Sequence, residues 1–297
     1  MQVLQSSIGM MRRRPVRMAS AVLLVCVSMA MTLSVACQSE QQTSGQLEVV
    51  ATILPVADFV KNVGGERVDV TVMVPPGASP HSYEPVPSQM VAIGRAQAYF
   101  AVGSGVEFEL MWMDKVIEAN PDMLVVDCSE GVQLRGADPH IWNSPANAMI
   151  MVENICDGLI RVDPGHASFY TRNRDDYLEE LKILDGYVHW KLDGFISRHF
   201  MVYHPSFDYF AAEYGLTPVV VEQEGKEPTP KILQDCIDKA LQYNLRYIFV
   251  EPQFVTDDCE TIAAEIGGQT APMDPLPENY IANIGRIADA LELEFQD

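Results

Sequence analysis

The sequence has few basic residues. Lys and Arg number 20 against 41 Asp and Glu, so the formal net charge at pH 7 is −21. A chain this acidic repels phosphate backbones, which argues against nucleic acid as a partner. Its negative field attracts cations, although solubility accounts for the acidity equally well.

Cysteine motifs are also missing. The six cysteines include no CxxC pair and no other short metal-binding spacing. Scattered cysteines of this kind are often small buried apolar residues. We therefore assign no function to the four that follow Cys37, which are Cys128, Cys156, Cys236 and Cys259. The sequence shows no internal repeat either.

Acidic residues are absent from the N-terminus, where the first is Glu40. Four Arg residues between positions 12 and 17 precede an apolar run at 19–36. This layout predicts a secretory signal peptide over residues 1–36. The alternative is a transmembrane anchor, because the run is nearly long enough to span a bilayer. Removal of the signal would leave the chain still more acidic, since the segment contains Arg but no acid.

Cys37 directly follows the small residues that end this run. The sequence SVAC at 34–37 resembles a lipoprotein signal-peptidase box, with Ser34 where Leu is usual. We expect a diacylglyceryl thioether on Cys37 to hold the protein at the outer side of the cell membrane, with the polar residues 37–46 as a tether. The alternative is a cysteine that ends an ordinary signal.

Short apolar runs alternate with amphipathic segments in the rest of the chain. Strands are expected at 46–53, 68–74, 98–103, 123–128, 200–204, 217–222 and 246–251. Helices are expected at 55–63, 87–96, 107–119, 206–214, 229–243, 256–266 and 277–295. This alternation predicts an α/β fold of mostly parallel sheets flanked by helices.

One long segment, 164–198, has no strand signal and interrupts the alternation. Its apolar residues recur at helical steps, with Asp163 as a candidate N-cap and Pro164 in the first turn. We predict a single helix of about 50 Å. It would bridge an N-terminal lobe over 47–163 and a C-terminal lobe over 199–297.

Three histidines share one kind of surrounding. His81 in SPHSYEP, His140 in ADPHIW and His204 in VYHPSF each adjoin a proline at or after the end of an expected strand. Ligands of open α/β sheets bind at the carboxyl ends of the strands, so we expect the three to meet. Asp274 in APMDPL has a similar placement. Three imidazoles and one carboxylate form a complete tetrahedral set for a cation such as Zn²⁺.

Other polar residues are given structural roles. His166, His189 and His199 lie on or beside the long helix and are interpreted as surface or flanking residues. Glu84 and Glu251 could serve as general bases, but the simpler interpretation is a loop-fixing or surface carboxylate. A further acidic cluster is interpreted as a solvated loop; its members are Glu222, Glu224 and Glu227.

Six motifs of the sequence, taken together, resemble those of a known family. The motifs PGASPHSYEPVPS, DPHIW, YHPSFDYFAAEYGL, EGKEPTP, FVEPQF and MDPL, in this order from about residue 47 onward, resemble the metal-binding substrate-binding lipoproteins of ABC importers for zinc and manganese. The resemblance implies two α/β lobes bridged by a long helix, with the metal in the cleft between them. It carries the metal ligands onto His81, His140, His204 and Asp274. His204 stands where manganese and iron members carry Glu, which indicates the zinc branch; manganese or iron(II) is the alternative cargo.

The function implied is a lipid-anchored, monomeric, non-catalytic zinc receptor that delivers its ion to a membrane permease. Many zinc members carry a His-rich acidic loop before the second ligand, but SEGVQLRGAD occupies that place here. Two alternatives come from other classes. A zinc-dependent hydrolase would need an open coordination position and a placed base. A surface adhesin built on the same scaffold is the other, and only the surface location argues for it.

Overall fold

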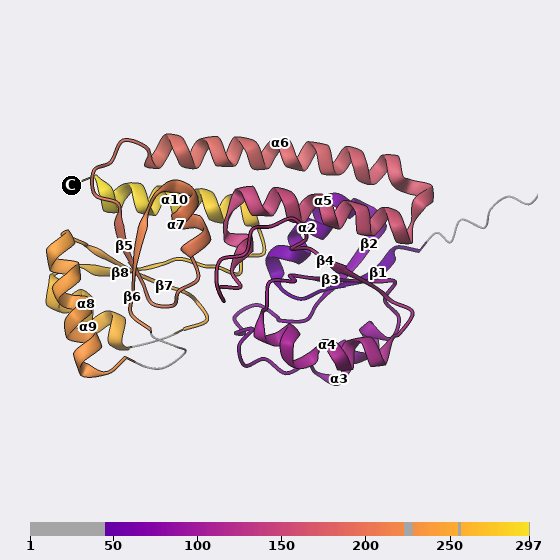
Figure 1. Ribbon diagram of the computed structural model, residues 1–297, viewed down its shortest axis with the longest axis horizontal. Coiled ribbons are helices and arrows are strands. Elements are labelled where there is room, and N and C mark those ends of the chain that lie inside the picture. The colour runs from indigo at the N-terminus through magenta and orange to yellow at the C-terminus, as the bar shows by residue number, and fades with distance from the viewer. Residues whose placement is uncertain (1–44, 223–227, 255–256, 297) are drawn as a thin grey trace, which may run out of the picture. The chain divides into compact units, whose positions relative to one another are not determined.

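The computed structural model describes residues 45–222, 228–254 and 257–296 (Figure 1). Residues Gln46–Asp297 form one compact unit, distinct from Met1–Gly45. The predicted signal peptide and Cys37 therefore lie outside the described residues, as do Glu224 and Glu227. No helix among the described segments is both long enough and apolar enough to cross a bilayer.

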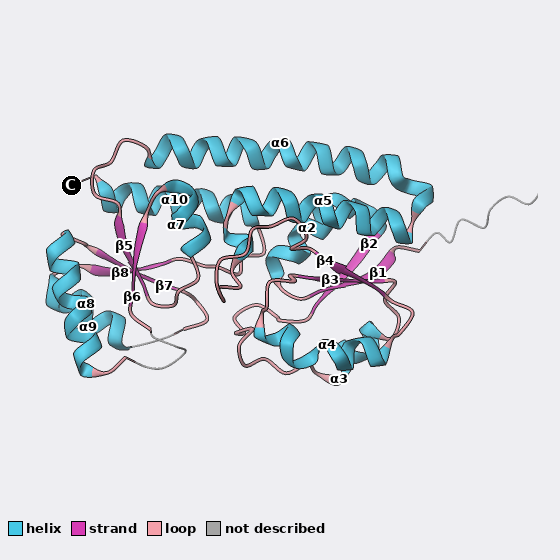
Figure 2. Ribbon diagram, in the orientation of Figure 1, coloured by secondary structure: helices cyan, strands magenta, loops and turns pink. Residues whose placement is uncertain are grey.

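Two four-stranded parallel sheets organise this unit, which confirms the predicted fold class (Figure 2). The first has the order β2-β1-β3-β4, with β1 (Leu47–Ala51), β2 (Val68–Val72), β3 (Ala98–Ala101) and β4 (Leu124–Asp127). The second has the order β6-β5-β7-β8, with β5 (His199–Val202), β6 (Thr217–Val220), β7 (Tyr247–Val250) and β8 (Gln269–Pro272). We call residues 46–163 the N-terminal lobe and residues 199–296 the C-terminal lobe.

Helices pack against both sheets. The helices of the described residues are α2 (Leu54–Gly64), α3 (Pro87–Ile93), α4 (Glu107–Ala119), α5 (Pro145–Val162), α6 (Ala167–Leu192), α7 (Asp208–Tyr214), α8 (Pro230–Tyr243), α9 (Asp257–Ile266) and α10 (Tyr280–Phe295). Two elements, α5 and β8, were not predicted. The start of α5 does carry a signal, because Ser144 caps the Asn147 backbone N–H and Pro145 occupies the first turn. The sequence of β8, QTAP, has one β-branched residue and no apolar run, so the strand depends on pairing with β7.

The long helix α6 is shorter than the predicted 164–198 at both ends. Residues Pro164–His166 form a separate 3₁₀ turn before it. At the other end Asp193 has extended backbone and Gly194 has φ of 97°, a conformation that favours glycine and ends the helix. The expected apolar stripe is buried at Tyr170, Tyr177, Leu181, Leu184, Val188 and Leu192. This stripe packs on α5 and α2 and then on α10, so α6 connects the two lobes.

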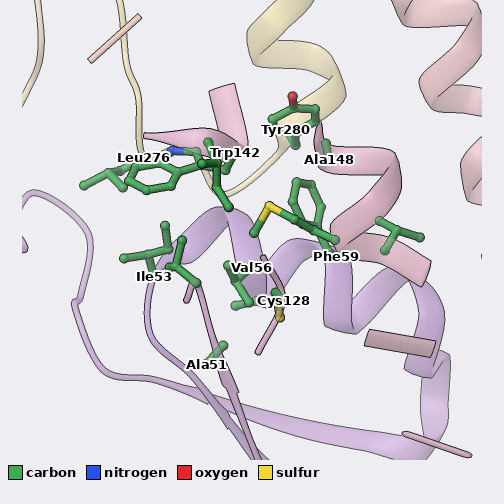
Figure 3. Packing of buried hydrophobic residues seen from close by; sticks show 14 of the residues in the cluster. Ala51, Ile53, Val56, Phe59, Cys128, Trp142, Ala148, Leu276 and Tyr280 are labelled. Carbon is green, nitrogen blue, oxygen red and sulfur yellow. The ribbon is translucent and has the colours of Figure 1, made fainter. Parts of the chain in front are cut away.

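A continuous hydrophobic core runs through both lobes along α6 and α10. Phe59 of α2 meets Tyr280 of α10 edge to face, with ring centroids 4.9 Å apart (Figure 3). The inner face of the second sheet joins this core through Phe200 and Phe249. Its outer face forms a smaller core with α8 and α9, which includes Met201. The four cysteines after Cys37 are buried in these cores, as expected.

Candidate metal-binding site

The structure brings three of the four predicted ligands together. Within the described residues, one group of possible metal-ligating side chains emerges, formed by His81, His140 and His204, whose ligand atoms all lie within 4.8 Å of one another. His204 follows β5, His140 lies in the loop before α5, and His81 lies in the loop after β2. Residues from both lobes line the cleft around them.

The proline-rich loop after β2 is held in shape by hydrogen bonds within the loop. The Ala78 N–H donates to the Pro75 carbonyl oxygen at 3.1 Å, and the Tyr83 N–H donates to the Ser79 carbonyl oxygen at 3.1 Å. The His81 N–H donates to the Ser79 hydroxyl oxygen at 3.3 Å. These turns, together with the prolines, limit the positions of His81 although no strand or helix carries it.

Each histidine has a carboxylate beside its Nδ1 atom. The distances are 2.9 Å from His81 to Glu107 Oε2, 2.7 Å from His140 to Asp138 Oδ1, and 2.5 Å from His204 to Glu222 Oε2. For His140 and His204 this contact is a hydrogen bond, which favours the tautomer with the proton on Nδ1. The lone pair of these two rings is then on Nε2, where it can bind a cation.

The Nε2 atoms of His81 and His204 lie 3.1 Å apart. At this distance one ring can donate an N–H to the other, and a cation that binds both rings would take the place of that proton. Two imidazole nitrogens bound to one tetrahedral zinc ion lie about 3.3 Å apart, close to the spacing found here.

The three histidines differ in how deeply they are buried. His140 and His204 are each 7% exposed, whereas the side chain of His81 is 32% exposed and that of Glu107 is 44% exposed. Burial lowers the pKa of His140, with Asp138 opposing the shift, so this ring stays neutral and able to bind a metal. Two rings therefore lie in the protein interior and the third lies at the mouth of the cleft.

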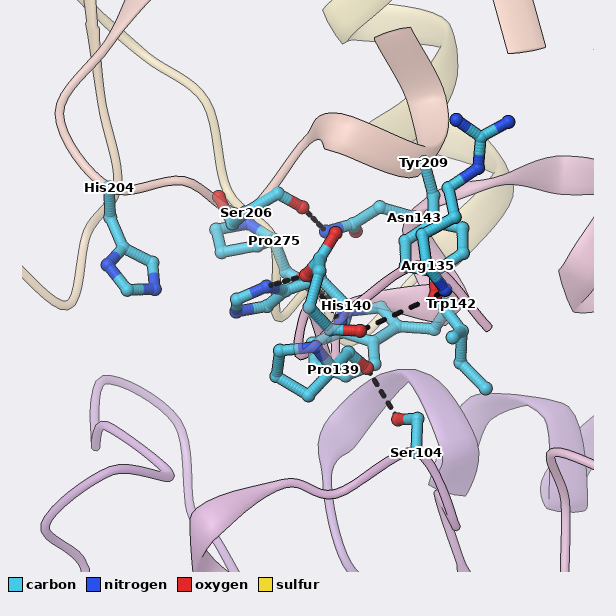
Figure 4. A network of polar contacts seen from close by, with 12 residues as sticks. Ser104, Arg135, Pro139, His140, Trp142, Asn143, His204, Ser206, Tyr209 and Pro275 are labelled. Carbon is cyan, nitrogen blue, oxygen red and sulfur yellow. Dashed lines mark hydrogen bonds and ion pairs between the residues drawn. The ribbon is translucent and has the colours of Figure 1, made fainter. Parts of the chain in front are cut away.

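The loop that carries His140 is hydrogen-bonded to the C-terminal lobe (Figure 4). The Trp142 indole N–H donates to the Pro275 carbonyl oxygen at 2.7 Å, and the Asn143 side-chain N–H donates to the Ser206 carbonyl oxygen at 2.7 Å. Trp142 also packs edge-on against His140, with ring centroids 5.2 Å apart. His140 is thus fixed relative to the loops that follow β5 and β8.

Asp274 lies near this loop but outside the histidine group. Its Oδ1 atom accepts hydrogen bonds from Gln253 Nε2 at 3.0 Å and from the Leu276 N–H at 2.9 Å. The Asn283 side chain donates to its carbonyl oxygen at 2.7 Å. The half-buried carboxylate is therefore already engaged by protein donors.

The interpretation of Glu222 as a solvated residue is wrong. Its side chain is 6% exposed and contacts the imidazole of His204. A signal for this role was present, since Glu222 follows β6 as His204 follows β5. Glu107 and Asp138, the other carboxylate partners, were not predicted. His166, His189 and His199 are half-buried and lie outside the histidine group.

Glu251 is a buried carboxylate beneath His204. It is 0% exposed and accepts hydrogen bonds from the His204 N–H at 3.2 Å and the Ser206 hydroxyl at 3.1 Å. Burial raises its pKa to about 7. The loop-fixing interpretation agrees with these contacts. Glu84 is exposed.

Known proteins that are similar to this chain identify its family. The family described as "ZnuA: Zinc-uptake complex component A periplasmic" matches residues 49–293. The zinc-binding lipoprotein AdcA of Streptococcus pneumoniae serotype 4 is 28% identical over 302 residues, covering 91% of this chain and 60% of AdcA. The chain thus spans about 60% of the length of that relative.

A second relative carries another metal in its name, and a solved structure supports the fold. The manganese ABC transporter substrate-binding lipoprotein PsaA of Streptococcus anginosus is 32% identical over 267 residues, covering 82% of this chain and 85% of PsaA. A crystal structure of ZnuA superposes with a TM-score of 0.82 at 36% identity, covering 84% of this chain and 100% of that chain. Because the family match extends over both lobes, this chain belongs to the ZnuA family of periplasmic zinc-uptake components.

Proposed function

We propose that this protein is an extracytoplasmic receptor that binds one divalent metal ion, with zinc as the cargo, and delivers it to an ABC-type importer. The observation that carries the proposal is the meeting of His81, His140 and His204, each with a carboxylate beside Nδ1. The ion would bind to the three Nε2 atoms. Asp274 remains the predicted carboxylate at the fourth position.

The donor set supports zinc as the cargo. Imidazole nitrogen favours Zn²⁺ over the oxygen-preferring ions Mg²⁺ and Ca²⁺. Manganese or iron(II) is the alternative, because these ions also bind imidazole and the supply of each metal decides occupancy in the cell. PsaA, a relative at 32% identity, is named for manganese.

Delivery would depend on the contact that the ion makes with both lobes. His81 belongs to the N-terminal lobe and His204 to the C-terminal lobe, so a shared ion links them. Binding stabilises the arrangement that holds the ion by RT ln(1 + [M]/Kd). A permease that recognises this arrangement would accept the loaded receptor in preference to the unloaded one.

We propose no catalytic role. A zinc hydrolase needs a base placed to activate a bound water. Glu251 is held by His204 and Ser206, and Glu84 does not line the cleft, so neither is placed as such a base. The hydrolase alternative therefore has no supporting contact among the described residues.

The location rests on the predicted lipid anchor at Cys37, with the protein acting as a monomer on the outer side of the membrane. Cys37→Ser should release the protein into the soluble fraction, because no thiol would remain for the diacylglyceryl group. Fractionation of cells that express either form measures this. Retention of the variant in the membrane would point to the alternative, an uncleaved anchor.

Metal competition tests the receptor function. The purified protein is stripped, offered equimolar zinc, manganese and iron(II), and assayed for metal bound per chain. One tightly held zinc would support the proposal. Manganese or iron retained against zinc would overturn the cargo and leave the receptor function in place. The absence of stoichiometric metal would overturn the function.

A further inference from the structure

An apolar ring covers one face of His204. The Phe254 ring stacks on this imidazole, with centroids 4.9 Å apart and planes 25° apart. The same ring contacts Tyr203, with centroids 5.6 Å apart. The Phe254 N–H donates to the Glu251 carbonyl oxygen at 2.9 Å, and this hydrogen bond closes a short turn after β7. Phe254 is therefore held against a predicted ligand by both its backbone and its side chain.

The three histidines line two spaces that differ in size and in the polarity of their walls. The inner cavity has a volume of about 20 Å³, and its walls include the apolar residues Val106, Trp142 and Leu276. The outer cleft has a volume of about 810 Å³, and its walls include the carboxylates Asp138, Asp208 and Glu222. A cavity needs about 10–15 Å³ to hold one water, so the inner cavity has room for one ion but not for an ion with a shell of water. Phe254 lines both spaces.

Access of water matters because the candidate metals differ in the number of ligands that they prefer. Zn²⁺ is satisfied by four tetrahedral ligands, which three imidazoles and the predicted Asp274 carboxylate provide. Mn²⁺ prefers six ligands that are rich in oxygen. At this site it would need additional ligands, and water from the outer cleft is their source. The apolar shell of a metal site controls the access of solvent, so the residues that separate the ion from the outer cleft influence which metal binds.

We propose that Phe254 is a specificity-determining residue for the cargo, because its ring keeps the water of the outer cleft away from the bound ion and thereby favours four-coordinate zinc over six-coordinate manganese. The proposal rests on the proposed receptor function and explains how that site would select its metal. The hydrocarbon ring offers water no hydrogen bond. It also leaves His204 free to bind, since the lone pair of Nε2 lies in the plane of the imidazole and Phe254 stacks on the face.

Affinity measurements on matched variants test this assignment. Phe254→Ala opens the wall to water, whereas Phe254→Leu keeps an apolar side chain there without the aromatic ring. Tyr243→Ala is the control, because Tyr243 stacks on His199, an imidazole outside the histidine group, with centroids 3.7 Å apart. Zinc and manganese affinities are measured by chelator competition. We expect the preference for zinc over manganese to fall about tenfold in Phe254→Ala, to be largely kept in Phe254→Leu, and to stay unchanged in the control.

Two spectroscopic measurements separate the exclusion of water from a merely structural role. Cobalt(II) substituted for zinc absorbs visible light strongly when it is tetrahedral and weakly when added water raises its coordination number. The bands should therefore weaken in Phe254→Ala and keep their intensity in Phe254→Leu and Tyr243→Ala. In the Mn²⁺-loaded protein, water-proton relaxivity should rise in Phe254→Ala alone. A structural role would lower the affinity for both metals equally and leave the cobalt bands unchanged.

Two results would overturn the assignment in a wild-type protein that binds zinc. One is equal metal preference and equal cobalt spectra in Phe254→Ala and in the Tyr243→Ala control. The other is a loss of preference in Phe254→Leu as large as that in Phe254→Ala, which would identify stacking on His204 as the cause. A wild-type protein that retains manganese against zinc would overturn both this assignment and the zinc cargo. A wild-type protein without metal would instead overturn the receptor function on which the assignment rests.

Discussion

The two sheets have the same strand order and the same hydrogen bonds at their carboxyl ends, but only one carries the site there. The Thr52 N–H donates to the Phe100 carbonyl oxygen in the first sheet, and the Tyr203 N–H donates to the Phe249 carbonyl oxygen in the second. This pairing makes Ile53, the residue after Thr52, the counterpart of His204. One sheet thus ends in a buried apolar side chain and the other in a predicted metal ligand.

The neighbouring strands repeat the contrast. The Val74 N–H donates to the Thr52 carbonyl oxygen, and the Glu222 N–H donates to the Tyr203 carbonyl oxygen in the same pattern. Val74 is an apolar core residue, whereas Glu222 contacts the imidazole of His204. Equal topology therefore provides equal positions, and the residue type at each position decides whether it binds a ligand or fills the core.

The N-terminal lobe contributes its histidines from loops instead. His81 lies in the proline-rich loop after β2, and His140 lies in the loop before α5. Hydrogen bonds from Trp142 and Asn143 attach the second of these loops to the C-terminal lobe. Hydrogen bonds therefore attach the His140 loop to the lobe that carries His204, whereas the His81 loop is held by turns of its own backbone.

The largest expected effect is the loss of a buried ligand. His204→Ala should lower zinc affinity by more than about 100-fold, the upper range for loss of an outer partner alone. His189→Ala, which removes a 45% exposed imidazole of α6, is the matched control. Competition titration measures both. Equal isotherms for the two variants would contradict the site.

The second-largest expected effect is a fall in metal affinity at low pH. Protons compete with the metal for imidazole nitrogen, so affinity should fall by about tenfold or more per pH unit below the ordinary histidine pKa of about 6.5. Because burial lowers the pKa of His140, that ring stays neutral at pH values where an ordinary histidine is half protonated. Titrations between pH 5 and pH 8 check this. An affinity independent of pH would argue against imidazole ligands.

Substitution of the carboxylates beside His204 and His81 tests the two lobes separately. Glu222→Gln should lower affinity by about 10–100-fold, because a buried charge that orients His204 is lost. Glu107→Gln should cost less, since Glu107 and His81 are partly exposed and solvent screens their interaction. Parallel competition titrations measure the two losses. A larger loss of affinity in Glu107→Gln than in Glu222→Gln would contradict the expectation that the buried carboxylate contributes more than the exposed one.

The smallest effect should be on stability. Trp142→Phe removes the indole N–H that binds the Pro275 carbonyl oxygen and should lower the free energy of unfolding by about 1–2 kcal/mol. Trp190→Phe on α6 is the control, because Trp190 is 72% exposed. Chemical denaturation of the metal-free proteins measures the difference. No difference would mean that this link between the His140 loop and the C-terminal lobe is not stabilising.

Much of this molecule is determined by local sequence. The alternation of apolar runs and amphipathic segments fixes most strands and helices, because burial of one face or one stripe needs that periodicity. The helical steps from Tyr170 to Leu192 likewise determine the buried stripe of α6. Proline beside each of His81, His140 and His204, at or after a strand, was enough to predict that the three would meet.

Only the tertiary structure decided which groups surround those histidines. Glu222 appears in the sequence as one of several loop acids, yet the pairing of β6 with β5 places it on His204. Likewise, Asp274 stays a predicted ligand, but that its Oδ1 atom accepts a hydrogen bond from Gln253 follows from the tertiary structure alone. Contacts of this kind join residues from different strands and loops, and their partners are set by packing, which no local pattern encodes.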